Sequence, residues 1–298
     1  MKNSKFLMLC INRANNLIIF KRKISSINKM VINYAKLFKY PVKGLLLDIS
    51  GVLKDGDIPI QGSVEAIKTL QAKGIPFRLL TNETLKPQAT IRNTLNKLGY
   101  NVTDKDMFCP IPFLKNILKA ENLRPHLLLH PRMIAEFEGI DLNNPNCVVI
   151  GDAEDHFNYE SLNKCFRQLM DMEKPVLFSL GMGKYYMDDD GLALDVGAYT
   201  KGIEYATGVK ARVVGKPTAE FFLAGAKDLG LQPNEVVMVG DDIESDIGGA
   251  QACGMRGVLV RTGKFRKTDE VHPAVEPDAI VDNLQMFVNI ILKEIGKL

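Results

Sequence analysis

Four short segments of the chain place acidic, basic and hydroxyl side chains directly after apolar, strand-like runs. In an open parallel sheet, ligands bind outside the carboxyl ends of the strands, so these side chains are expected to meet at one edge. Together they supply carboxylates, one amine, and hydroxyl and amide donors, a set suited to a metal ion and a phosphate group. The segments are Asp48-Ile49-Ser50-Gly51, Thr81-Asn82, Gly215-Lys216-Pro217 and Gly240-Asp241-Asp242.

The acids predict a Mg²⁺ site, because Mg²⁺ prefers one or two protein carboxylates, several waters and a substrate phosphate. We expect Asp48 and Asp241 to hold the ion together with the backbone carbonyl of Ser50, and Asp242 to take a weaker or more distant position. An aspartate can also attack phosphorus and form an aspartyl phosphate, which splits one difficult displacement into two steps. Asp48 is the candidate nucleophile.

The remaining polar groups predict a phosphate-binding site around that nucleophile. Lys216 and Thr81 would offset the charge on the phosphoryl oxygens, and Ile49, Ser50 and Asn82 complete the expected binding segments. Taken singly, such residues are more often turn or cap residues than functional ones. Their occurrence in this order, each after an expected strand, favours one common site.

Strand and helix patterns alternate along the chain and predict parallel βαβ units in a doubly wound α/β sheet. Buried strands are expected as short apolar runs, and helices as longer stretches with apolar residues on one face. The expected strands are 44–48, 75–80, 126–130, 147–150, 175–179, 211–214, 236–239, 257–260 and 279–281, and the expected helices are 63–72, 87–98, 159–171, 218–229, 246–253 and 283–295.

The motifs and their order resemble those of the haloacid dehalogenase superfamily of phosphatases, from about residue 42 to the C-terminus. In that resemblance Asp48 matches the nucleophile, Thr81 the hydroxyl of motif II, Lys216 the lysine of motif III, and Asp241 with Asp242 the acids of motif IV. The resemblance implies a Mg²⁺-dependent hydrolase in which Asp48 and Lys216 are catalytic.

The spacing of these motifs predicts where a second domain is inserted. Only 33 positions separate Asp48 from Thr81, whereas 135 separate Thr81 from Lys216. A smaller α/β cap of the C2 type is therefore expected between motifs II and III. The predicted organisation is a basic N-terminal extension over 1–40, a first core segment over 41–114, the cap over 115–210 and a second core segment over 211–298.

Ser50 departs from the superfamily pattern, in which most phosphatases carry a second aspartate two residues after the nucleophile. A hydroxyl cannot serve as a proton donor near neutral pH, and general acid–base catalysis contributes typically ~10²–10⁴-fold. Its loss would penalise poor leaving groups such as sugar alkoxides. The phosphate of pyrophosphate, or the nitrogen of phosphohistidine or phospholysine, would suffer less.

Several further stretches make the chain similar to the branch of the superfamily that hydrolyses inorganic pyrophosphate and P–N bonds. They are Thr81-Asn-Glu83, Glu173-Lys-Pro-Val, Tyr185-Tyr186, Leu194-Asp-Val-Gly197 and Val271-His-Pro. This resemblance implies a homodimer in the cytoplasm and nucleus, acting on small phosphorylated substrates, pyrophosphate or phosphohistidine in proteins. Three alternatives stay open: a C2-capped phosphatase of another small ester, a phosphate- or partner-binding relative without turnover, and a phosphotransferase.

Charge is distributed unevenly along the chain. The formal net charge is +3, but residues 1–40 contain nine Lys or Arg and no acid, which leaves 29 basic against 35 acidic residues, or −6, for the rest. A nucleic-acid-binding surface is therefore not indicated. The extension is too short and polar to span a membrane, and its composition allows a mitochondrial transit peptide as the alternative to a cytoplasmic location.

Weaker candidates lie in the expected cap and in motif IV. Lys184, Tyr185 and Tyr186 could line the substrate pocket, although ordinary packing of a hairpin is favoured. The acids 188–190 fit a solvated turn better than a calcium site, because no EF-hand spacing follows. Asp246 could reach the surroundings of the metal, but an acid at a helix N-terminus explains it equally well.

Overall fold

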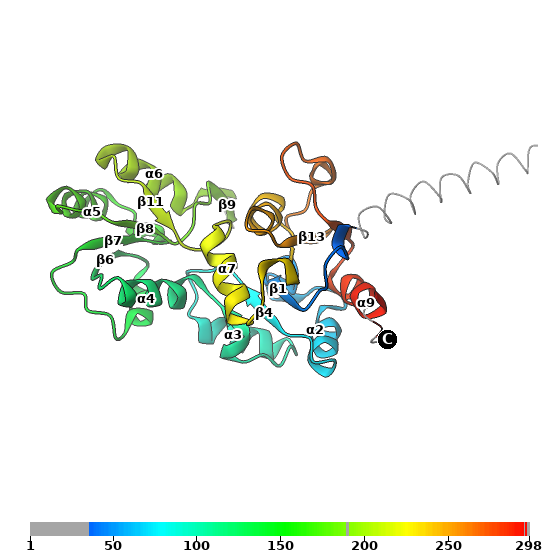
Figure 1. The fold of residues 1–298 in the computed structure, drawn as a ribbon. Coiled ribbons are helices and arrows are strands. Elements are labelled where there is room, and N and C mark those ends of the chain that lie inside the picture. The colour runs from blue at the N-terminus through cyan, green and yellow to red at the C-terminus, as the bar shows by residue number, and fades with distance from the viewer. Residues whose placement is uncertain (1–35, 189–190, 295, 297–298) are drawn as a thin grey trace, which may run out of the picture.

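The computed structural model describes residues 36–188, 191–294 and 296. Within these ranges the chain forms a six-stranded and a four-stranded parallel sheet, which lie in separate halves of the molecule (Figure 1), and two short hairpins. The larger half is the core, and the smaller half is the cap. Of the expected N-terminal extension, residues 1–35 lie outside the described part.

The core sheet is doubly wound, as the sequence predicts. Its strand order is β14-β13-β12-β1-β4-β5, and all neighbouring strands are parallel. Strands that follow β1 in the chain lie on one side of it and the late strands on the other, so the order reverses at β1 and β12. The strands are β1 Gly44–Asp48, β4 Phe77–Leu80, β5 Met107–Phe108, β12 Val236–Gly240, β13 Arg256–Val260 and β14 Ala279–Val281.

Strand β1 is apolar up to its last residue, Asp48, because both faces of the core sheet are covered by helices. Leu45 and Leu47 pack into one apolar cluster with α2, α3 and α9, whereas Leu46 faces α7 and α8 on the opposite side. The core helices are α2 Ser63–Ala72, α3 Gln88–Lys97, α7 Ala219–Asp228, α8 Gly249–Ala252 and α9 Leu284–Glu294, and a π-helix, Ile243–Gly248, precedes α8.

The cap is a smaller sheet of the same kind, with the parallel order β11-β8-β7-β6. Alternate residues of β7 enter two different clusters, Val149 towards α4 and Val148 towards α5 and α6. The elements are α4 Pro110–Ala120, β6 Pro125–Leu128, β7 Cys147–Ile150, α5 Tyr159–Asp171, β8 Leu177–Ser179, α6 Val196–Thr207 and β11 Ala211–Val213.

The chain crosses between the two sheets at points that differ from the expected boundaries. Helix α4 spans the expected boundary at 114, and its Ile111 and Leu114 pack in the cap cluster. Strand β11, expected to begin the second core segment, pairs with β8 in the cap sheet. A three-residue strand carries too little pattern to show which sheet it joins, so the choice is made by tertiary packing.

Two hairpins and several short 3₁₀ helices complete the described structure. Strands β9 Tyr185–Asp188 and β10 Gly191–Leu194 form the hairpin expected around residue 188, whose turn at 189–190 lies outside the described residues. The second hairpin joins β2 Lys54–Asp55 and β3 Ile58–Pro59. The 3₁₀ turns are Asp104–Asp106, Pro131–Phe137, Glu154–His156, Pro233–Glu235 and Lys267–Val271. Over the described ranges, no helix has the length and apolar character needed to cross a membrane.

Arg256 anchors the end of the expected N-terminal extension to the core. Its buried guanidinium donates hydrogen bonds to the carbonyls of Leu37, Tyr40, Pro41 and Asn234. Leu37 is fully buried in the core cluster. The segment that directly precedes β1 is therefore part of the packed core, although composition alone assigned it to an extension.

We expect Arg256→Met to lower the free energy of unfolding by roughly 3 kcal/mol, because the substitution keeps aliphatic volume but leaves one buried and three partly buried hydrogen bonds to carbonyls unmade. Chemical denaturation would measure the change. Arg92→Met is the matched control, since Arg92 pairs with Asp104 at the surface and its loss should cost less than about 1 kcal/mol. Equal costs for the two variants would contradict the anchoring role.

Candidate active site

Asp48 lies at the carboxyl end of β1, where the order of the core sheet reverses. The register aligns it with Leu80 of β4, while Leu47 aligns with Val239 of β12. The residues that follow these strands, Thr81 and Asp241, are therefore brought beside it. The carboxylate of Asp48 is mostly buried and accepts a hydrogen bond at Oδ1 from the amide of Ile49, at 2.8 Å.

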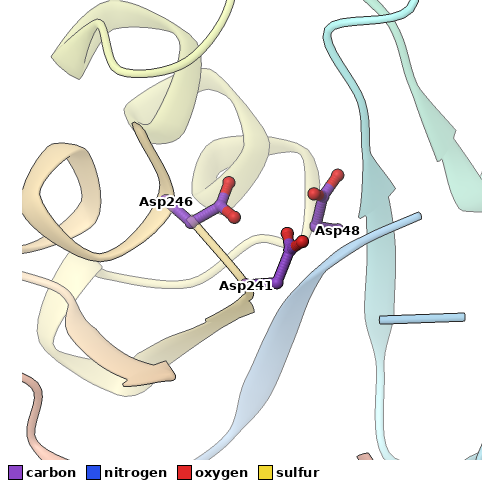
Figure 2. Close-up of side chains that lie close together, drawn as sticks. All are labelled: Asp48, Asp241 and Asp246. Atoms are coloured by element: carbon purple, nitrogen blue, oxygen red, sulfur yellow. The ribbon is translucent and has the colours of Figure 1, made fainter. Parts of the chain in front are cut away.

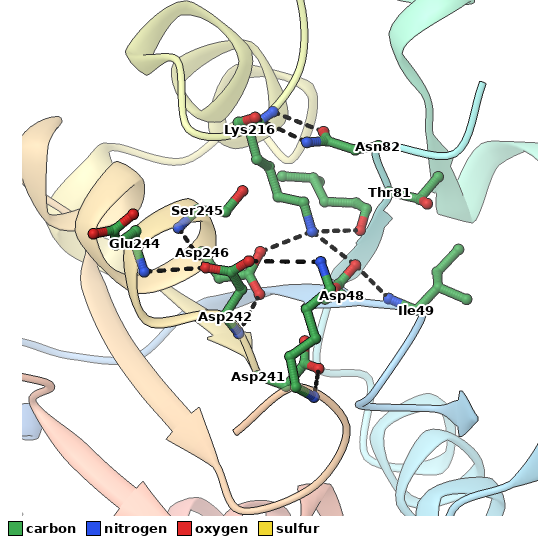
Figure 3. Close-up of polar contacts among 12 residues, drawn as sticks. Asp48, Ile49, Thr81, Asn82, Lys216, Asp241, Asp242, Glu244, Ser245 and Asp246 are labelled. Carbon is green, nitrogen blue, oxygen red and sulfur yellow. Dashed lines mark hydrogen bonds and ion pairs between the residues drawn. The ribbon is translucent and has the colours of Figure 1, made fainter. Parts of the chain in front are cut away.

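Lys216 supplies a buried positive charge to this site. Its Nζ lies 2.7 Å from Oδ1 of Asp48 and 2.8 Å from Oδ1 of Asp246, and it donates a longer bond of 3.4 Å to the carbonyl of Leu80 (Figure 3). Although burial lowers the pKa of Lys216, the carboxylates of Asp246 and Asp48 raise it above its ordinary value. The amine is therefore charged at neutral pH.

Asn82 fixes the backbone of Lys216. Its side-chain oxygen accepts a hydrogen bond from the Lys216 amide, and its side-chain nitrogen donates one to the Lys216 carbonyl, both at 2.8 Å. Next to it, Thr81 is buried, and its Oγ1 accepts a bond from the amide of Glu83 at 3.0 Å. Thr81 directly follows Leu80, the residue of β4 that is aligned with Asp48.

Three carboxylates gather at the edge of the core sheet (Figure 2). Asp48, Asp241 and Asp246 each place one oxygen within 4.8 Å of the others, and all three are buried. When all three acids are ionised, the cluster carries three negative charges against the one positive charge of Lys216. The two uncompensated charges equal those of a divalent cation, and carboxylate oxygens are the donors that Mg²⁺ prefers.

The chain matches known sequences and structures over most of its length. Residues 45–156 match the haloacid dehalogenase-like hydrolase family and residues 213–287 a second family described as HAD-hydrolase-like. A zebrafish (Danio rerio) protein named phospholysine phosphohistidine inorganic pyrophosphate phosphatase is 51% identical over 259 residues, which cover 86% of this chain and 96% of that protein. The chain belongs to the haloacid dehalogenase-like hydrolases.

A second sequence relative supports this assignment, and a solved structure shares the fold. The bovine (Bos taurus) haloacid dehalogenase-like hydrolase domain-containing protein 2 is 41% identical over 235 residues, covering 78% of this chain and 90% of that protein. A p-nitrophenyl phosphatase from Archaeoglobus fulgidus superimposes with a TM-score of 0.78 at 22% identity, covering 84% of this chain and all of that one. At this identity the structural match shows the fold alone.

In this haloacid dehalogenase-like hydrolase, Asp246 completes the carboxylate cluster, and Asp242 does not. The carboxylate of Asp242 instead caps the π-helix, where its Oδ1 accepts hydrogen bonds from the amides of Glu244 and Ser245 (Figure 3). Asp246 lies on the first turn of that helix, and its Oδ2 accepts a bond from the Asp242 amide at 3.2 Å. Sequence reasoning noted Asp246 but did not give it a primary role.

Crowding of the acids perturbs their protonation. Burial first, and the neighbouring carboxylate of Asp48 as well, raise the pKa of Asp241 well above its usual range. Burial likewise raises the pKa of Asp246, although Lys216 opposes this effect. A bound divalent cation would stabilise the ionised forms, so the donor set fits the Mg²⁺ that the sequence predicts.

The loop after Asp48 packs tightly against Asp241. Gly51 has a φ of +83°, and a Cβ there would lie 2.0 Å from Oδ2 of Asp241, so only glycine fits. Ser50 is exposed beside this contact. Its expected role as a carbonyl ligand stays a prediction.

The cap residues named from the sequence lie on or just before the β9–β10 hairpin. Tyr185 is 57% exposed and Lys184 is also exposed. The ordinary packing favoured for this hairpin therefore does not bury Tyr185. The alternative that Lys184, Tyr185 and Tyr186 line the substrate pocket stays a prediction.

We expect Mg²⁺ to raise the midpoint of thermal unfolding more at about pH 8.5 than at about pH 5. The pKa values of Asp241 and Asp246 are higher in the folded protein than the unfolded value near 4, so without a cation stability falls as pH rises through this interval. At the higher pH, Mg²⁺ offsets the repulsion between the ionised acids and so stabilises the folded protein. At the lower pH, protons compete with Mg²⁺ for the same carboxylates, so the stabilisation is smaller.

Asp241→Asn should reduce this Mg²⁺ effect and stabilise the metal-free protein at alkaline pH, as differential scanning fluorimetry would measure. Asp228→Asn is the control, because Asp228 pairs with Arg78 far from the cluster. The same Mg²⁺-induced shift at both pH values, or in Asp241→Asn, would contradict the assigned metal site.

Proposed function

We propose that this hydrolase is a Mg²⁺-dependent phosphatase that cleaves inorganic pyrophosphate and the P–N bonds of phosphohistidine and phospholysine. The observation that carries the proposal is the buried Asp48 carboxylate, which is paired with Lys216. Asp48 belongs to a cluster of three carboxylates whose full ionisation leaves two negative charges that Lys216 does not compensate. The similarity to the zebrafish phosphatase supports the substrate class. The homodimer and the cytoplasmic or nuclear location, which the family resemblance implies, stay predictions.

Asp48 is oriented for nucleophilic attack on phosphorus. Its Oδ1 is occupied by the Ile49 amide and the Lys216 ammonium, whereas Oδ2 has no hydrogen-bond donor within the described ranges. We infer that Oδ2 attacks, so that an Oδ2–P bond forms as the bond between phosphorus and the leaving group breaks. The electron pair of the broken bond departs with the leaving group.

The second half of the reaction restores the carboxylate. Water attacks phosphorus of the aspartyl phosphate, the Oδ2–P bond breaks, and orthophosphate is released with one proton passing to solvent. Lys216 and the Thr81 hydroxyl would hold the transferring phosphoryl oxygens in both steps, because both lie beside Asp48 and can donate hydrogen bonds. When bound, Mg²⁺ would offset charge on these oxygens and on the acids.

Ser50 determines which leaving groups this arrangement serves well. The position offers a hydroxyl instead of a carboxylic acid, so an alkoxide would depart without a proton donor at this position. The phosphate released from pyrophosphate is stable as an anion and needs no proton in the transition state. The proposed substrates therefore match the residue at this position.

Asp48→Asn should lower Mg²⁺-dependent phosphate release from pyrophosphate and phosphohistidine by at least about a thousandfold, because the amide cannot act as the nucleophile. Phosphate release measures the loss, circular dichroism checks the fold, and Asp228→Asn is the surface control. Retained turnover would overturn the covalent mechanism. Transfer of phosphate to added alcohol acceptors in place of water would instead indicate a phosphotransferase.

Ser50→Asp should raise activity towards a sugar phosphate relative to pyrophosphate by about tenfold or more, since it supplies the missing general acid. Ser50→Asn is the matched control, being similar in size but unable to transfer a proton. The ratio of kcat/KM values for the two substrates is the measurement. An equal change in both variants, or a wild type that prefers the sugar phosphate, would contradict the interpretation of Ser50.

A further inference from the structure

A loop after β13 closes one side of the active site. The hydroxyl of Thr262 donates a hydrogen bond to the carbonyl of Gly51. A Cβ on Gly263 would lie 2.5 Å from the Cα of Gly51, so the two loops touch directly beside Ser50. The amide of Lys264 then donates to Oδ2 of Asp241 at 2.6 Å.

This loop brings a second lysine to the site. The Nζ of Lys264 lies 3.6 Å from Oδ2 of Asp242, and its side chain is 75% exposed. Desolvation lowers the pKa of Lys264, but the acids of the site, with Asp242 first and Asp241, Asp48 and Asp246 after it, raise it above the ordinary value. The ammonium is therefore charged and lies within the electric field of the carboxylate cluster.

The ammonium groups of Lys216 and Lys264 differ in how accessible they are to a ligand. Lys216 is buried and makes short ion pairs with Asp48 and Asp246, so its charge is committed to the nucleophile and the transferring group. Lys264 makes one long ion pair, at an exposed position. Its ammonium can exchange that contact for an anion that enters from solvent.

We propose that Lys264 binds the phosphate that leaves from pyrophosphate and stabilises the charge that develops on it. This inference rests on the proposed function and assigns the leaving group a site of its own. The contacts of Thr262 and Gly263 with Gly51 hold the loop that carries Lys264 beside the segment that contains Ser50, where the sequence lacks a general acid.

The chemistry of the leaving group explains why a lysine suits this place. When the P–O bond of pyrophosphate breaks, its electron pair stays on the bridging oxygen, and the departing phosphate gains negative charge. An ammonium stabilises that charge by attraction and a hydrogen bond, without transferring its proton. When the imidazole of phosphohistidine already carries a proton on its second nitrogen, the electron pair of the broken P–N bond leaves it as neutral imidazole. No negative charge develops on this leaving group, so it gains little from a nearby cation.

Lys264→Met in the full chain tests this role. The substitution removes the charge but keeps the backbone amide that binds Asp241. With Mg²⁺ present, kcat/KM for pyrophosphate should fall by about tenfold to a hundredfold, while kcat/KM for phosphohistidine changes by less than about threefold. Lys264→Arg should retain most pyrophosphate activity. Lys267→Met, an exposed lysine three residues further on, should behave as wild type.

A binding measurement separates this role from an effect on turnover. In the Asp48→Asn background, Lys264→Met should weaken binding of pyrophosphate with Mg²⁺ by about tenfold, as calorimetry would measure. Binding of orthophosphate, which fills the position of the transferring phosphoryl group, should change little. Equal weakening of the two ligands would show that Lys264 acts on the cluster as a whole, and would overturn the proposal.

The kinetic outcomes distinguish this inference from the proposed function. A wild type that hydrolyses pyrophosphate, combined with equal losses on both substrates or no loss in Lys264→Met, would overturn the role of Lys264 alone. A wild type that releases no phosphate from pyrophosphate would overturn both proposals. A selective loss on pyrophosphate, rescued by arginine, would support both.

Discussion

The site depends on one buried ammonium. Lys216 joins Asp48, at the end of a core strand, to Asp246, on a helix that follows another core strand. Burying charged groups costs free energy unless they are paired, and removing one partner leaves the other uncompensated. Nζ of Lys216 therefore fixes both the nucleophile Asp48 and the π-helix that carries Asp246. It also fixes the segment in which the chain returns from the cap to the core. The excess of acids around it then favours a divalent cation.

The larger elements could be predicted because their signals are local. Strand β1 is an uninterrupted apolar run that ends in Asp48, and β12 is a similar run before Asp241, so both are recognisable as buried parallel strands that end at a polar edge. The chain order of the motifs then placed Thr81 and Lys216 at that edge without any knowledge of distances. The structure brings all four residues together there, as Figure 3 shows for the side chains.

The remaining details could not be predicted because they depend on contacts between distant residues. Asp242 and Asp246 are both acids near a helix start. The sequence does not show which of the two carboxylates accepts hydrogen bonds from the backbone amides at the N-terminus of that helix. The π-helix also changes the angular position of each residue relative to an α-helix. Strand β11 was assigned to the core because it precedes Lys216, whereas its pairing with β8 is set by packing across the cap.

The assignment of β11 to the cap has a consequence for how the two halves work together. Lys216 follows a cap strand by only three residues, yet both of its backbone polar groups are held by Asn82, which follows core strand β4. Displacement of the cap sheet would therefore be taken up at Gly215, because Val214 is hydrogen-bonded to Ser179 of the cap, whereas moving Lys216 would break two hydrogen bonds and two buried ion pairs. The cap can therefore shift to admit different substrates while Asp48 and Lys216 keep their geometry.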